Sequence, residues 1–241
     1  MNFKWRIFLG LVAIVSLNTS STAFASSSYV QHKVSSGKFA IRSACFMPAS
    51  AQLVKVGVKG AERMPKESDD WAVALQVLVQ THLKADGIGI NSATDPLSSG
   101  ASDDEVRQVI SQIDQKYNSV SPLMDKKPRA VAKSAYTLGD QVGMLPCSEN
   151  SDILVFVQGA GQVLTGGRAT MTFLVGGPAE GAILIVTMAD AKTGEILGLV
   201  KIRPGMGFLD NAENAFGEGL DNELSDMNIG SARKNAREKG H

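Results

Sequence analysis

The stretch DILVFVQG, residues 152–159, decides the fold of this chain. Its central residues, 153–157, are all apolar and follow Asp152 directly. A continuous apolar run of this length, rich in branched and aromatic side chains, is typical of a strand that is covered on both faces. It predicts the central strand of a sheet.

The residues that follow predict a hairpin and a last helix. Apolar residues fill 182–188 and 196–202, and the polar segment 190–194 between them ends in a glycine that suits a turn. Beyond the hairpin, apolar residues recur every three or four positions from about 211 to 224, as on the buried face of a helix.

Hydrophobic periodicity before residue 152 predicts three strands and three helices. The strands are expected at 39–47, where Pro48 halts the run, at 53–58 and at 88–90, and the helices at 68–85, from Ser102 and from Pro128 to Gly139. Ser68 is placed to cap the first helix, and Glu105 completes a capping box with Ser102. The order predicts the α/β class, a single domain in which helices pack on a mixed β-sheet.

The first twenty-five residues predict an export signal. Lys4 and Arg6 precede an apolar run from 7 to 17, and Ala23-Phe24-Ala25 has the small-x-small pattern that signal peptidase accepts. Cleavage is expected after Ala25, which leaves Ser26 as the mature start. The alternative, a retained membrane anchor, needs roughly 20 apolar residues, and polar residues follow Leu17 directly. The mature chain is therefore expected to lack a transmembrane segment.

The organisation predicted from these patterns has four parts. Residues 1–25 are the signal peptide, residues 26–38 a flexible lead-in without periodicity, residues 39–226 the α/β domain, and residues 227–241 a basic flexible tail. The tail is interpreted as a solvated end, with weak contact to an anionic envelope surface as the alternative.

Charge excludes one class of partner. The whole chain has 24 basic and 24 acidic residues, and removal of residues 1–25 takes away Lys4 and Arg6 but no acid. The mature protein is thus nearly neutral, whereas nucleic-acid binding demands a clustered basic face. No nucleic-acid partner is expected.

Two cysteines permit one bridge. Cys45 and Cys147 can form a disulfide in an oxidising compartment, and two buried thiols are the alternative. Both interpretations stay open. No metal site and no cofactor are expected, because the three histidines are scattered and no Cys/His pair has a ligand spacing.

A glycine-rich segment follows the central strand. Residues 159–168 lack the glycine of the dinucleotide fingerprint at Leu164, and have Gly167-Arg168 where a P-loop needs lysine and a hydroxyl residue. A structural bend is favoured, and a strand pair and a short helix between loops remain open for 159–177. If a ligand binds there, the candidates that would hold an anion are the following: Gly159, Gly161, Gly166, Gly167 and Arg168.

No catalytic residue is predicted. The chain has no glycine-x-serine-x-glycine elbow. His82 falls on the apolar face of the helix predicted at 68–85, where a hydrogen-bonded core histidine is a better interpretation than a general base, because a base also needs an aligned nucleophile.

The order of elements resembles a group of bacterial envelope domains. The likeness lies in Met47-Pro48 at the end of the first strand, the capped helix 68–85, residues 152–159 and the hairpin 182–202, and it covers residues 39–226. These features are similar to the TolB amino-terminal domain, the curli-secretion channel lipoprotein and the lipoprotein activators of penicillin-binding proteins. The resemblance implies a TolB-like fold and a binding or assembly module rather than an enzyme.

This chain departs from the lipoproteins of that group at its mature start. Ala25-Ser26 stands where they carry a lipidated cysteine, so a free periplasmic or secreted protein is expected. The predicted function is a non-catalytic envelope module that binds an envelope protein or itself through a sheet edge or the glycine-rich segment. The alternative is a small-ligand-binding protein or hydrolase that uses the loop from Gly159 to Arg168.

Overall fold

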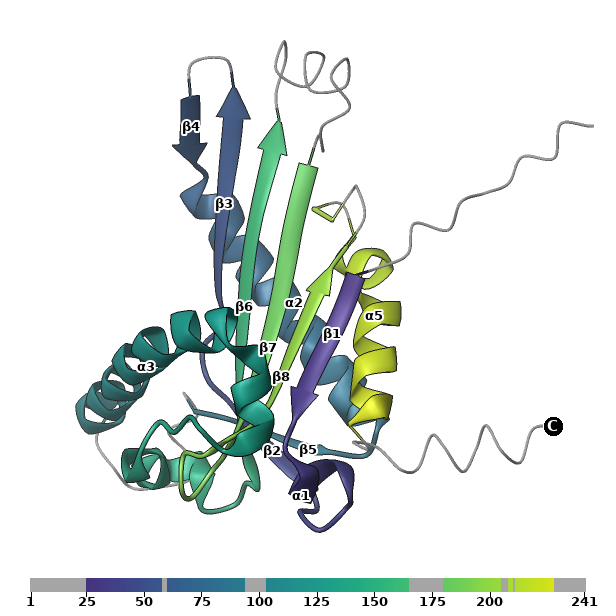
Figure 1. Ribbon diagram of the computed structural model, residues 1–241. Helices are drawn as coiled ribbons and strands as arrows, with labels where there is room; N and C mark the ends of the chain where they lie inside the picture. The colour runs from purple at the N-terminus through teal and green to yellow at the C-terminus, as the bar shows by residue number, and fades with distance from the viewer. Residues whose placement is uncertain are drawn as a thin grey trace, which may run out of the picture.

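Strand β6 (Ile153–Leu164) lies inside a mixed sheet, as the apolar stretch predicts (Figure 1). The computed structural model describes residues 25–57, 60–93, 103–164, 180–204, 208–209 and 211–227. Along one edge, β6 pairs antiparallel with β7 (Glu180–Asp190). Along the other it pairs in parallel with β2 (Ser43–Phe46) at its start and with β3 (Ser50–Gly57) from Gln158 onward.

The described strands form one sheet of eight, in the order β1-β8-β7-β6-β2-β5, with β3 and β4 continuing from the second half of β6. The remaining bounds are Ala25–Val30 for β1, Gly60–Arg63 for β4, Gly89–Ser92 for β5 and Ile196–Arg203 for β8. The pairings of β2 with β5, β2 with β6 and β3 with β6 are parallel, and the others are antiparallel. The predicted α/β class with a mixed sheet is confirmed.

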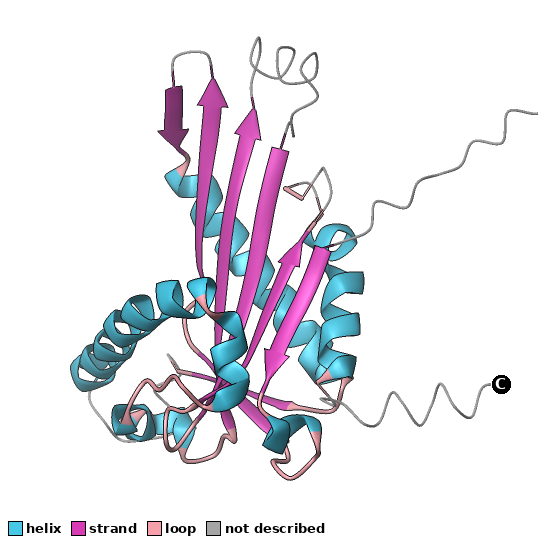
Figure 2. Ribbon diagram, in the orientation of Figure 1, coloured by secondary structure: helices cyan, strands magenta, loops and turns pink. Residues whose placement is uncertain are grey.

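Helices cover both faces of the sheet (Figure 2). On one face lie α2 (Pro65–Ala85) and α5 (Ala212–Asp226). On the other lie α3 (Asp103–Lys126) and three short 3-10 helices, which are η2 (Pro128–Lys133), η3 (Asp140–Met144) and η4 (Pro146–Ser148). A short helix, α1 (His32–Ser35), follows β1.

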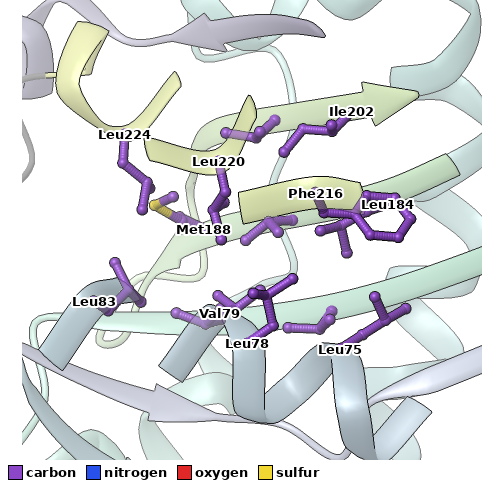
Figure 3. Packing of buried hydrophobic residues seen from close by; sticks show 14 of the residues in the cluster. Leu75, Leu78, Val79, Leu83, Leu184, Met188, Ile202, Phe216, Leu220 and Leu224 are labelled. Carbon is purple, nitrogen blue, oxygen red and sulfur yellow. The ribbon is translucent and has the colours of Figure 1, made fainter. Parts of the chain in front are cut away.

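One hydrophobic core lies between the sheet and the α2–α5 pair (Figure 3). Leu75 and Val79 of α2 and Phe216 and Leu220 of α5 are fully buried around Leu184 of β7. Each such side chain contributes about 1.5–3 kcal/mol when it leaves water. This core therefore holds the two helices on the sheet.

The second core lies under α3. Ile113 and Tyr117 of α3 are buried against Leu154 and Phe156 of β6, whose neighbours point to the first core. Successive side chains of a strand point to opposite faces. Because both sets are apolar from 153 to 157, the strand is buried on both sides.

Pro48 divides what would otherwise be one strand. The amide of Met47 still bonds the carbonyl of Val155, at 3.0 Å, but proline has no amide to continue the ladder. The edge of β6 therefore passes from β2 to β3 at this point. The predicted strand 39–47 is confirmed only over Ser43–Phe46.

The predicted start of α2 at Ser68 is wrong. The helix begins one turn earlier, with Pro65 at its first position, where the missing amide and fixed φ of proline are favourable. Ser68 lies inside the helix, where its hydroxyl donates to the carbonyl of Met64 at 2.6 Å and accepts from the amide of Leu53 at 2.9 Å. The serine thus joins α2 to β3.

The helix predicted from Pro128 to Gly139 is also shorter in the structure. Only the 3-10 helix η2 forms, and Ser134 ends it with a φ of 56°. The backbone amide of Leu138 then donates a hydrogen bond to the carbonyl of Gly194 at 2.8 Å, which attaches the segment to the hairpin between β7 and β8. That hairpin lies where it was predicted.

The flexible lead-in expected over residues 26–38 is instead part of the fold. Ala25–Val30 forms β1, which pairs with β8 along its whole length, and α1 follows. The serines of β1 show no apolar period, but the ladder uses backbone groups, which every residue type carries. Gln31 adds a side-chain bond to the carbonyl of Ile196 at 2.6 Å.

Several predicted features lie outside the described residues. They are residues 1–24 of the signal peptide, Ser102 of the predicted capping box, residues 165–177 of the glycine-rich segment and residues 228–241 of the basic tail. Within the described part of the chain, no helix has the length and apolar character that crossing a membrane requires.

Candidate functional site

The glycine-rich segment begins as strand, not as loop. Residues 159–164 belong to β6 and pair on one side with β3, and residues 159–163 also pair on the other side with β7. Their backbone groups are therefore used in two ladders. Gly159 and Gly161 are in this part, whereas Gly166, Gly167 and Arg168 lie outside the described residues.

Gly159 and Gly161 are required by packing. A Cβ at Gly159 would lie 2.5 Å from Leu75 Cδ1 and 2.8 Å from Trp71 Cζ3, and one at Gly161 would lie 2.9 Å from both Leu53 and Phe208. Both glycines face α2, and larger side chains would displace the first core. Within the described residues, these two glycines thus make space for aromatic rings rather than a cradle for an anion.

Among the described residues, no helix covers the opposite side of this part of the same strands. Exposure alternates along β6, so that Gly159 and Gly161 are buried while Ala160 and Gln162 are exposed. Together with neighbours on β3, β7 and β8 they line a shallow depression of about 530 Å³. We name this surface the open face and define it by Gln52, Val54, Ala160, Gln162, Ile183 and Arg203.

The open face exists because α3 is confined to the lower part of the sheet. In Figure 1 the upper parts of β3, β6 and β7 extend beyond α3, whereas α2 runs along the far side of these strands. A sheet face of this extent without a helical cover is a place where another surface can pack.

A small polar cavity lies at the lower end of the open face, where α3 begins to cover the sheet. It has a volume of about 80 Å³ and is lined by side chains of α3 and β6 and by the segment around Pro48. Asp114 of α3 lines it, and burial raises the pKa of this carboxyl above its ordinary value. No pattern in the sequence distinguishes Asp114 from a solvated helix residue.

Tyr117 forms a fixed wall of this cavity. Its ring stacks on Phe156, with centroids 4.3 Å apart and an interplanar angle of 14°. Its hydroxyl lies 2.9 Å from Thr187 Oγ1 and donates to Gln158 Oε1 at 3.2 Å. Burial raises the pKa of Tyr117 to about 12, so the phenol keeps its proton at neutral pH.

Cys45 of β2 and Cys147 of η4 are joined by a disulfide, with Cα atoms 5.7 Å apart. Both residues are buried in the core under α3, beside Leu145 and Leu154. The bridge therefore attaches the centre of the sheet to the 3-10 segment that covers it. Of the two alternatives for the cysteines, the structure contains the bridge.

His82 is a hydrogen-bonded residue of α2, as the apolar face predicts. Its Nδ1 lies 2.6 Å from Asp221 Oδ1, and its Nε2 lies 3.2 Å from Glu213 Oε1, both on α5. The imidazole is buried, and its two nitrogens are engaged by carboxylates of the neighbouring helix. Among the described residues, no group of histidine, cysteine and acidic side chains is arranged to hold a metal ion.

Comparison with known proteins adds little to this geometry. No family model matches the chain, and no curated protein matches it. Two matching solved structures are both of the PelC dodecamer from Paraburkholderia phytofirmans, one of them a variant in a different space group. The first is 12% identical, covers 85% of this chain and 96% of that chain, and has a TM-score of 0.38. The second is 10% identical, covers 85% and 97%, and has a TM-score of 0.36. With TM-scores this low, the likeness assigns neither function nor partner to this chain.

Proposed function

We propose that this chain is an exported bacterial envelope protein that acts as a non-catalytic binding or assembly module in the periplasm. Its partner is another envelope protein or a second copy of the same chain. The observation that carries the proposal is the open face, where no helix of the described residues covers one side of three neighbouring strands.

The chemistry of the open face suits a protein surface. Gln52, Ala160 and Gln162 are exposed, uncharged and flanked by half-buried Val54 and Ile183. Both edges of β6 are paired at this level, so the face is held in shape before any partner arrives. Mixed apolar and amide surfaces of this kind are common where proteins associate.

Two features support the proposed compartment. Residues 1–25 have the pattern of a cleaved export signal. A disulfide inside the fold persists in an oxidising compartment such as the periplasm. The order of elements also resembles the envelope domains related to the TolB amino-terminal domain, which are binding modules.

The ligand or hydrolase alternative has less support. It uses the backbone amides from Gly159 to Arg168, and residues 159–163 already pair with both β3 and β7. A partner on the open face, by contrast, needs only side chains that are exposed. We therefore favour the binding module.

Site-specific photocrosslinking in intact cells tests the proposal. A photoreactive phenylalanine analogue replaces Gln162 on the open face and, as the matched control, exposed Lys84 on α2. We expect protein adducts from Gln162 and not from Lys84. Mass spectrometry of the adduct separates a second copy from a different protein, and the mass of the processed chain tests cleavage before Ser26.

Two results would overturn the proposal. One is the absence of any protein adduct at Gln162 in cells that contain folded, processed protein. The other is equal crosslinking from Gln162 and Lys84, which would indicate random collision rather than a binding surface.

A further inference from the structure

The small cavity beside α3 is a product of the strand break at Pro48. Pairing of β6 with β2 ends at Val155 and pairing with β3 begins at Gln158, so the sheet has a gap in its ladder between them. Helix α3 crosses this gap and roofs it. The lining of the cavity includes Ser50, Asp114, Tyr117, Asn118, Phe156 and Gln158.

The carboxylate of Asp114 is unusual among the acids of α3. Asp104 is almost fully exposed and pairs with Arg107, and Asp125 pairs with Lys201. Asp114 is half-buried, and no cation of the described residues lies within ion-pair distance of it. An external cation would stabilise the ionised carboxylate in this position, because burial without an ion-pair partner disfavours the charged form.

The rest of the cavity suits a cation too. The stacked and buried rings of Tyr117 and Phe156 form one rigid wall of the cavity. Ser50 and Asn118 add oxygens that accept hydrogen bonds. Gln158 Oε1 accepts from Tyr117 and, at 3.4 Å, from Ser121, which holds that wall in place.

Volume limits what enters. About 80 Å³ is two to three times the volume of about 30 Å³ that a water molecule occupies in the liquid. That space admits an ammonium group and the last methylenes of its chain.

The cavity and the open face lie next to each other on the same side of the sheet. Ser50 and Gln52 are two residues apart on β3, and Gln158 and Ala160 are two residues apart on β6, so each pair points to the same side of the sheet. A partner that lies on the open face can therefore extend a long side chain downward, beneath the edge of α3, to Asp114.

We propose that this cavity is a socket for an alkylammonium group, held by the carboxylate of Asp114, and that the group is the side chain of a lysine on the partner bound at the open face. Only the source of the ammonium rests on the proposed function. The socket itself is a property of this chain.

The first experiment tests the ammonium chemistry. Backbone NMR spectra of the mature, oxidised protein are recorded during titration with n-butylamine at neutral pH, with n-butanol as the uncharged control. We expect shifts that cluster at the residues lining the cavity with the amine and not with the alcohol. In Asp114→Asn the affinity for n-butylamine should fall about tenfold, because a charge-assisted bond is lost. The matched control, Asp104→Asn, should bind as the parent does.

The second experiment tests whether the ammonium group comes from a lysine of the partner. A water-soluble carbodiimide joins a carboxylate directly to an amine in contact with it, and in intact cells it should link Asp114 to a lysine of another protein chain. Asp114→Asn should lose this adduct while photocrosslinks from Gln162 persist.

The outcomes separate the two proposals. Equal shifts in the parent and in Asp114→Asn, or equal shifts with amine and alcohol, would overturn the socket. Amine binding without a carbodiimide adduct at Asp114 would overturn the lysine as its source and leave a free amine. Photocrosslinks at Gln162 without amine binding would overturn the socket alone, and the proposed function would stand.

Discussion

His82 Nδ1 lies 2.6 Å from Asp221 Oδ1, and this contact joins the two helices on the same face of the sheet. Glu213 approaches the other ring nitrogen at 3.2 Å. Gly217 makes that approach possible, because a Cβ there would lie 2.5 Å from Glu213 Oε1. A glycine within a helix costs about 1 kcal/mol relative to alanine. The contact between α2 and α5 is therefore accommodated at the expense of local helix stability.

We expect His82→Leu to lower the free energy of unfolding by about 1–3 kcal/mol, since it removes the hydrogen bonds of a buried imidazole to part-exposed carboxylates of the neighbouring helix. Chemical denaturation of the mature protein measures the change. The neighbouring exposed residue supplies the control, as Thr81→Ala should stay within about 0.5 kcal/mol of the parent. Equal stability of His82→Leu and the parent would mean that the imidazole contacts contribute nothing net to the fold.

Apolar pattern was sufficient for the centre of this fold. The run 153–157 and the hairpin that follows it were predicted because buried strands need continuous apolar side chains on both faces. β1 could not be found in this way, because its pairing with β8 depends on backbone groups and its serines show no pattern. The start of α2 was misplaced because Ser68 has the chemistry of a cap but uses it to hold β3.

The candidate sites also depend on contacts between residues that are distant in the sequence. Glycines after a strand are frequent in phosphate loops, yet Gly159 and Gly161 are explained by the rings and branched chains of α2 and its neighbours, which are distant in sequence. Asp114 lies beside the apolar stripe of α3, where a carboxylate is usually solvated. Only the crossing of α3 over the gap at Pro48 encloses it. The local sequence pattern cannot predict that α3 crosses the sheet at this point.

Glu195 should make stability depend on pH at the hairpin. Burial raises its pKa, but hydrogen bonds from Lys33, Ser134 and Gln31 outweigh burial and lower the pKa below its ordinary value of 4.5. A lowered pKa in the folded state means that the contribution is fully present above pH 4.5 and is lost as the pH falls through the folded value. The anchoring of α1 to the hairpin should weaken over that range.

Comparison of the parent with Glu195→Gln measures this effect. We expect the parent to be more stable by up to about 1 kcal/mol above pH 4.5, as for partly exposed ion pairs, and the difference to shrink in more acidic solution. In a Lys33→Met background, most of the stability difference between Glu195 and Gln at this position should disappear. A difference in free energy of unfolding between the parent and Glu195→Gln that grows on acidification would contradict the lowered pKa of Glu195.

Asp114 should have the opposite pH dependence. Burial raises the pKa of Asp114 above the ordinary 3.8, so ionisation of this carboxyl opposes folding. The free energy of unfolding should therefore fall as the pH rises from 3.8 through the pKa of the folded state. Asp114→Asn should therefore be more stable than the parent at neutral pH, with the gain disappearing in acid. Thermal unfolding at several pH values checks this, and a neutral-pH loss of stability in Asp114→Asn would show that the carboxylate has a structural role instead.

Gly159→Ala should destabilise the fold by about 1–3 kcal/mol. The new methyl would lie 2.5 Å from Leu75 Cδ1 and 2.8 Å from Trp71 Cζ3, and both side chains are buried and tightly packed. Gly181→Ala on the adjacent strand is the matched control, because nothing lies within 4 Å of its added Cβ. It should leave the free energy of unfolding unchanged or raise it by up to about 1 kcal/mol. Similar effects of the two substitutions would remove the packing explanation for Gly159.

The bridge between Cys45 and Cys147 should make stability depend on redox state. It closes a chain segment of 102 residues, and in the chain-entropy description a loop of about 100 residues is worth about 4.7 kcal/mol, with about 2–4 kcal/mol typical of measured bridges. We expect that amount to be lost when the mature protein is unfolded in the presence of a reductant. Because both sulfurs are buried, reduction should be slow in the folded state and fast in denaturant.

A variant with both Cys45→Ala and Cys147→Ala is the control, since its stability should be the same with and without reductant. Thiol titration of the unfolded, unreduced parent should detect no free thiol, whereas two free thiols per chain would show that the cysteines are unpaired in the exported protein. If the parent and the double variant respond alike to reductant, the bridge does not stabilise this fold. A single substitution, Cys147→Ala, should be less stable than the double variant in an oxidising medium, because it leaves Cys45 free to form mixed disulfides once the chain opens.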